Sequence, residues 1–305
     1  MANESDFFVV RPFAVTASNL TASNVTETEY DTYNASTSYG VVGQRVIYNH
    51  AVYENINGSG NIGKVPGTTD AANFWIYVSV SNRFKMFDTQ LSSQTTWPDQ
   101  ITASVTYTER PTRLYFGNVQ AQYITVEMRD STNAVVFTQT YQMYENTGTP
   151  SYYSFFTARL QRKTDLLVSG FPPLANCKFN ITIANNGATA KCGVMLAGYA
   201  DFIGVTQLGL TLGTRDFSVK QRNDFGDYQI LERAYSRYGE ATVLVNNAGI
   251  DRVIQTLANY RATATLFIAS NLYNSAMIYG FYDDFTNAVS YQEASLLNIR
   301  MEGLT

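Results

Sequence analysis

The chain has 305 residues, of which 15% are charged, and a formal net charge of −4 at pH 7. Lysine and arginine form no basic stripe interleaved with aromatic residues, so the composition argues against direct binding of nucleic acid. No apolar stretch approaches the roughly 18 to 20 residues that a membrane-spanning helix needs, so membrane insertion is not expected.

Abundant Tyr, Phe, Thr, Asn, Ser and Val predict a mainly β protein whose strands are joined by polar turns. A chain of this length has room for two or three domains, each with its own core. The patterns predict four segments in chain order: an N-terminal arm (1–38), a small β-module (39–95), a jelly-roll β-sandwich (96–209) and a C-terminal α+β domain (210–305).

Segment 1–38 is rich in Ser, Thr and Asn, and FFVV (7–10) is its one apolar anchor. This composition is typical of an extended arm with little core of its own, which becomes ordered only on assembly. The N-terminus has no basic region followed by an apolar run. We therefore expect a protein made in the cytoplasm without its own export signal.

Three short strands are expected in segment 39–95: RVIYN (45–49), AVYEN (51–55) and FWIYVSV (74–80). Two stretches rich in turn-forming residues, NGSGNIG and PGTTDAAN, separate them. Because the glycines do not lie between a strand and a helix, we interpret them as hairpin residues and not as a phosphate-binding loop.

The aromatic residues of this module suggest a carbohydrate site, because a ring can cover the apolar face of a sugar while tyrosine hydroxyls reach its hydroxyl groups. Two interpretations are open. Trp75 and its neighbours form the core of the small sheet, or Trp75 presents an exposed ring to a ligand or partner. The candidate carbohydrate-binding residues, expected on one side of the sheet, are Tyr39, Tyr48, Tyr53, Trp75 and Tyr77.

Segment 96–209 consists of alternating runs separated by short turns. In YITVEMRD (123–130), Ile124, Val126 and Met128 fall on one face, which is the pattern of a half-buried strand. A series of such strands favours a β-sandwich of jelly-roll type.

One helix is expected in segment 210–305, between the strands TVLVN and ATATLFIAS. Its apolar residues repeat at helical spacing, and asparagine or glycine precedes them. The apolar residues are Ile250, Val253, Ile254 and Leu257, after Asn246, Asn247 or Gly249.

No metal or cofactor site is predicted. His50 is the single histidine, and its position suggests a tight turn at the surface. Cys177 and Cys192 have no metal-binding spacing. Buried free thiols are favoured over a disulfide across a hairpin, because a cytoplasmic protein is kept reduced.

Carboxylates are the remaining catalytic candidates, since glycoside hydrolysis needs only two of them. Asp283 and Asp284 are neighbours, so on a strand they should point to opposite faces. Asp224, Asp227 and Glu232 are expected to be solvated or to cap turns. We therefore predict no catalytic residues and a protein that is not an enzyme.

The stretch from Tyr39 to Val78, with its Asn- and Pro-containing loop and closing Trp75, resembles the small chitin-binding-like modules of carbohydrate-binding proteins. In bacteriophage tail proteins a similar module precedes a heptad of the type N-R-[FW]-K-M-F-D, present here as NRFKMFD (82–88). Residues 198–285 resemble the C-terminal part of virion structural proteins of tailed bacteriophages, in which a galactose-binding-like sandwich comes first.

This resemblance implies a non-enzymatic structural component of a phage tail or baseplate, present in several copies as a ring or fibre anchor. The implied partners are other tail proteins, further copies of the chain and host cell-surface polysaccharide, and the implied location is the virion tail. The alternatives are a free-standing carbohydrate-binding protein, a capsid decoration protein, and a glycan depolymerase that uses Asp224 or Asp283.

Overall fold

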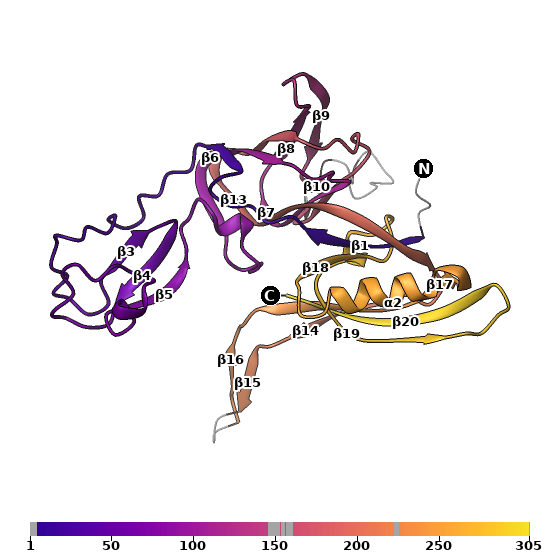
Figure 1. Cartoon of the computed structure of the whole chain (residues 1–305). Helices are drawn as coiled ribbons and strands as arrows, with labels where there is room; N and C mark the ends of the chain where they lie inside the picture. Colours follow the sequence, from indigo (N-terminus) through magenta and orange to yellow (C-terminus); the bar gives the residue numbers. More distant parts are fainter. Residues whose placement is uncertain (1–4, 146–152, 154–155, 157–160, 223–225, 305) are drawn as a thin grey trace.

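The computed structural model describes residues 5–145, 153, 156, 161–222 and 226–304. It confirms the mainly β class: a small three-stranded sheet, a sandwich-like body and a barrel make up the chain (Figure 1). Within these residues, no helix is both long enough and apolar enough to cross a membrane.

The small module is an antiparallel sheet of β3 (Arg45–Tyr48), β4 (Ala51–Asn55) and β5 (Trp75–Val80), as predicted. Tyr48 pairs with Ala51, so the β3–β4 turn contains only Asn49 and His50. Both have positive φ, 48° and 63°, which is the geometry of a type I′ hairpin turn. The tight turn predicted around His50 is therefore confirmed. Two 3₁₀ turns flank β5: η1 (Thr69–Ala71) and η2 (Lys85–Phe87).

The sandwich-like body has two layers that share the long strand β13 (Cys177–Thr206). In one layer β13 lies between β6 (Thr95–Tyr107) and β8 (Tyr123–Arg129), with β2 (Leu20–Ser23) and β9 (Val135–Gln142) outside them. The other layer contains β7 (Arg113–Gln120), β12 (Leu166–Val168) and the next part of β13. A separate short pair joins β10 (Tyr144–Glu145) to β11 (Gln161–Arg162).

Both layers contribute to one core, in which Ile124, Val126 and Met128 are fully buried, as their alternation predicted. Cys177 and Cys192 are buried free thiols, which confirms the prediction. Burial raises the pKa of the Cys177 thiol to about 11.

The C-terminal half closes into a six-stranded antiparallel barrel, because β13 pairs with both ends of the strand order. That order is β1 (Asp6–Pro12), β18 (Thr265–Ile268), β19 (Met277–Ala288), β20 (Ala294–Gly303), β17 (Tyr235–Asn246) and the end of β13. A 3₁₀ turn, η4 (Asn274–Ala276), leads into β19.

The predicted helix is η3 (Asn247–Gly249) followed by α2 (Ile250–Asn259). The Asn246 side chain accepts a hydrogen bond from the Ala248 amide at its start, which is an N-cap interaction. Val253 and Leu257 join the core of the barrel, whereas Ile254 is 39% exposed.

Segment 1–38 is not the loose arm that its composition predicted. β1 lies between β13 and β18, strands that are far apart in the sequence, and Phe7, Val9 and Val10 are fully buried. The predicted boundary at residue 210 is also wrong, because the barrel takes β1 from the N-terminus and the end of β13 from the sandwich. A strand whose partners are both distant leaves little local signal beyond FFVV.

β14 (Thr211–Asp216) pairs with β17, and the two strands continue outward as β15 (Val219–Arg222) and β16 (Tyr228–Leu231). This two-stranded ribbon extends away from the body (Figure 1). We call the described residues of 217–234 the projecting hairpin.

Replacing Phe7 with alanine is expected to destabilise the protein by about 3 to 5 kcal/mol, because a fully buried aromatic side chain would leave a cavity in the barrel. Urea unfolding followed by circular dichroism measures this free energy. The matched control is Val41→Ala, since Val41 is 65% exposed and should change stability by less than about 0.5 kcal/mol. Equal effects of the two substitutions would contradict a structural role for β1.

Candidate functional sites

Tyr39 and Trp75 lie in the core of the small module. Trp75 and Tyr39 are each only 4% exposed, and their rings meet edge to face with centroids 5.1 Å apart. The Trp75 Nε1–H donates to the Lys64 carbonyl oxygen at 2.8 Å. Neither ring offers an open face to a sugar. The prediction that Tyr39 and Trp75 bind carbohydrate is therefore wrong, because both rings are buried. The alternative interpretation, that Trp75 belongs to the core of the sheet, is the one that the structure supports.

Tyr33, which the sequence pattern missed, lies at the centre of this cluster. Its ring centroid is 5.7 Å from that of Tyr39, 5.7 Å from that of Tyr48 and 5.8 Å from that of Trp75. Tyr33 precedes the first strand of the module and belongs to the segment interpreted as an arm. Only its spacing relative to the other tyrosines could have indicated its role.

Three candidate tyrosines keep some access to solvent. Tyr77 is 55% and Tyr48 37% exposed. Tyr53 is half-buried, packs edge to face on Tyr77 at 6.0 Å, and has its hydroxyl against Gly67. Of the five candidates, Tyr77 and Tyr48 are thus the ones with substantial free surface. A sugar could reach these two side chains without unfolding the module.

His50 contacts Glu27, with Nδ1 3.0 Å from both carboxylate oxygens, and its ring packs on Phe84 at 4.7 Å. Glu27 also accepts a hydrogen bond from the Ser81 hydroxyl. Phe84 belongs to the core of the sandwich. His50 therefore connects the small module to the sandwich, a role that its sequence position did not indicate.

The acidic candidates do not assemble into a recognisable catalytic centre. Asp224 lies outside the described residues. Asp283 and Asp284 line one groove on the barrel because β19 bulges between Tyr282 and Asp284, so the expectation that they point to opposite faces is wrong. Across the part of the chain that the structure describes, no group of three metal-ligating side chains occurs.

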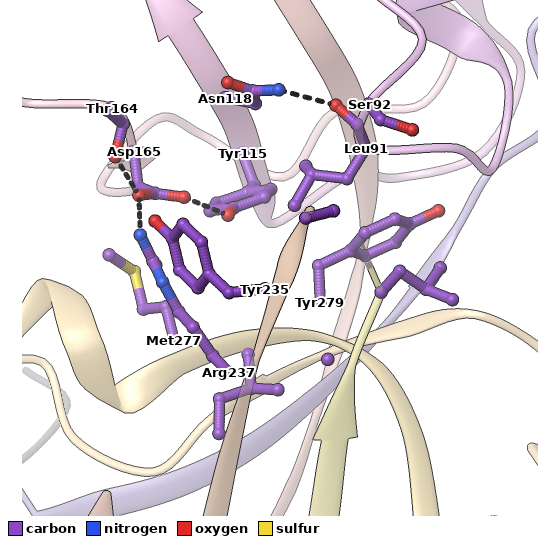
Figure 2. Close-up of a pocket in the computed structure, with 14 residues that line it drawn as sticks. Leu91, Ser92, Tyr115, Asn118, Thr164, Asp165, Tyr235, Arg237, Met277 and Tyr279 are labelled. Atoms are coloured by element: carbon purple, nitrogen blue, oxygen red, sulfur yellow. Dashed lines mark hydrogen bonds and ion pairs between the residues drawn. The ribbon is translucent and has the colours of Figure 1, made fainter. Parts of the chain in front are cut away.

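A cavity of about 190 Å³ lies where the sandwich meets the barrel. Figure 2 shows Asp165, Tyr115, Thr164 and Arg237 together at one end of it, while Leu91 and Tyr279 lie at the other. Most of its wall is apolar. Met277 and Tyr279 come from the barrel, and Tyr115 comes from the sandwich.

Asp165 organises the polar end of this cavity, although it is only 5% exposed. It accepts hydrogen bonds from the Tyr115 hydroxyl at 2.6 Å, the Thr164 hydroxyl at 2.6 Å and Arg237 Nη2 at 2.7 Å. Burial and the Asp165 charge raise the pKa of Tyr115 well above its usual value of 10. Burial lowers the pKa of Arg237, but the Asp165 carboxylate outweighs it and raises that pKa overall.

These hydrogen bonds leave both carboxylate oxygens of Asp165 satisfied, so the cluster resembles a structural clamp more than a reactive centre. Asp165 and Tyr115 belong to the sandwich, while Arg237 lies on β17 where the projecting hairpin begins. The cluster thus fixes the root of the hairpin against the sandwich.

Searches against protein-family models, curated proteins and solved structures find no match to this chain.

Trp75→Ala is expected to unfold the small module, because it removes the centre of the aromatic core. Tyr77→Ala should leave the module folded, since Tyr77 is 55% exposed. Thermal unfolding and near-ultraviolet circular dichroism distinguish the two. If the module binds polysaccharide through its exposed tyrosines, affinity electrophoresis should show weaker binding for Tyr77→Ala; unchanged binding would rule out Tyr77 as a contact.

Arg237→Gln is expected to destabilise the protein by roughly 2 to 3 kcal/mol. Breaking a fully buried ion pair typically costs about 3 to 5 kcal/mol, and the smaller value applies here because the Arg237 side chain is 29% exposed. The substitution leaves a buried carboxylate without its cation. Arg215→Gln is the matched control on the neighbouring strand β14, where the ion pair with Glu302 is exposed and is worth about 1 kcal/mol or less. Urea unfolding measures both, and equal effects would contradict the clamp.

Proposed function

We propose that this chain is a non-enzymatic structural subunit of a multi-copy assembly, and specifically of a bacteriophage tail or baseplate. The observation that carries the assembly role is the projecting hairpin. Its residues Tyr228, Ile230 and Leu231 are 67%, 66% and 56% exposed. Large apolar side chains on a ribbon that leaves the body are favoured when a partner covers them.

The attribution to a phage tail rests on the sequence resemblance, above all on the heptad NRFKMFD. Phe84 and Met86 of this heptad are buried in the sandwich core, and the Asn82 side chain bonds the backbone of Thr96 on both its donor and acceptor sides. The heptad is therefore a structural joint between the small module and the sandwich. Such a joint suits a protein that holds modules in fixed positions.

Contact with host cell-surface polysaccharide remains part of this proposal only through Tyr48 and Tyr77, because Trp75 and Tyr39 are buried. The candidate acids add no support for a depolymerase: Asp283 and Asp284 are exposed, and Glu240, the third acid of their groove, is paired with Arg300.

Sedimentation of the purified chain over a range of concentrations is expected to show an oligomer, because apolar surface on the hairpin would be covered by association. Mass spectrometry of purified virions of the phage that encodes it should detect several copies per particle. A chain that stays monomeric and is absent from purified particles would overturn the proposal.

A further inference from the structure

We infer that the projecting hairpin of one copy binds in a groove on the outer face of the barrel of a second copy. This inference rests on the proposed multi-copy assembly and specifies which two surfaces meet. It follows from two cations on one face of the hairpin, from the charge of the groove and from the direction in which the hairpin leaves the body.

The hairpin is basic and apolar on one face. Lys220 pairs with Ile230 and Arg222 with Tyr228 across the two strands, so these four side chains share a face. The described residues of the projecting hairpin include three cations, Lys220, Arg222 and Arg233, and two acids, Asp227 and Glu232, which lie outside β15 and β16. A two-stranded ribbon with exposed apolar groups is only marginally stable by itself in water, so a covering partner would stabilise it.

The two cations have only weak attachments within their own chain. Lys220 Nζ lies 3.0 Å from Asp216 Oδ2, but the side chains are 60% and 49% exposed, so this pair is worth little and is readily exchanged. The Arg222 guanidinium lies 5.5 Å from the centre of the Tyr228 ring, and its Nε–H donates to the Gly226 carbonyl oxygen. Arg222 is thereby held along the hairpin surface.

The groove has the opposite charge. It has a volume of about 440 Å³ and is lined by β14, β17, β19 and β20. Its charged residues are Glu240, Asp283, Asp284 and Arg300, so three acids and one cation give a net charge of 1 − 3 = −2. Arg300 lies 3.4 Å from Glu240, whereas Asp283 and Asp284 form no ion pair with any described residue.

The spacing of the two cations is about 3 Å shorter than that of the two acids. Lys220 and Arg222 are two residues apart on one strand, hence about 7 Å apart along it. Glu240, Arg300 and Asp284 form a row across three adjacent strands, which places the two acids about 10 Å apart. Long Lys and Arg side chains bridge that difference, while Ile230 and Tyr228 would cover the groove between them.

The groove must belong to a different copy. β14 and β17 line the groove and are also the strands that lead out into the hairpin, which extends away from its own barrel (Figure 1). A hairpin could reach its own groove only by breaking the pairing at its root. Contact between different surfaces of successive copies is head-to-tail, the geometry that builds rings or filaments.

Charge reversal tests the inference. The hairpin variant is Lys220→Glu with Arg222→Glu, and the groove variant is Glu240→Lys with Asp284→Lys. Each alone should weaken self-association about tenfold or more in sedimentation equilibrium, because like charges would face each other. The control variant, Arg110→Glu with Arg261→Glu, reverses two exposed cations on neither surface and should associate like the wild type.

Mixing and combining the variants distinguish this contact from a general loss of folding. A one-to-one mixture should regain assemblies of wild-type size, because the intact hairpin of the groove variant fits the intact groove of the hairpin variant, and the reversed hairpin fits the reversed groove. A chain with all four substitutions should regain self-association. Variants that keep the wild-type oligomer would overturn the inference and leave the proposed assembly standing, whereas a monomeric wild type absent from virions would overturn both.

Discussion

The architecture depends on one strand, β13, which runs for 30 residues and pairs successively with both layers of the sandwich and with the barrel. Its path requires two close backbone approaches. A Cβ atom at Gly198 would lie 2.2 Å from the Arg11 carbonyl oxygen, and one at Gly204 would lie 2.3 Å from the Leu244 carbonyl oxygen. Side chains at these positions would separate β13 from β1 and from β17, and the barrel would not close.

Because β13 is common to both bodies, the sandwich and the barrel are one continuous structure and not two domains on a linker. The Asp165 cluster reinforces this continuity on the side where the hairpin begins, since Arg237 on β17 contacts a carboxylate of the sandwich. The outer part of the hairpin, which lacks such contacts, is free to meet another surface.

Local patterns were sufficient wherever the order of residues along the chain itself shows the structure: strand alternation, helical spacing or a two-residue turn. The alternation around Ile124, the helix around Val253 and the turn at His50 were all predicted for this reason. Local patterns failed for β1. Its neighbours in the sequence are polar and suggest an arm, whereas its stability comes from pairing with β13 and β18. The hairpin was missed for the opposite reason: it has strand-like residues but no body to pack against.

The two sets of tyrosines show why composition alone could not locate a binding surface. In the small module, Tyr33 and Tyr39 pack against Trp75, because a three-stranded sheet needs large rings to exclude water from a core. In the hairpin, Tyr228 has the same chemistry but no second layer above it. The same residue type thus stabilises the fold where a layer covers it and offers contact area where none does. Only the fold shows which of these rings are buried. On that ground the main candidate interaction surface is the hairpin and not the cluster around Trp75 in the small module.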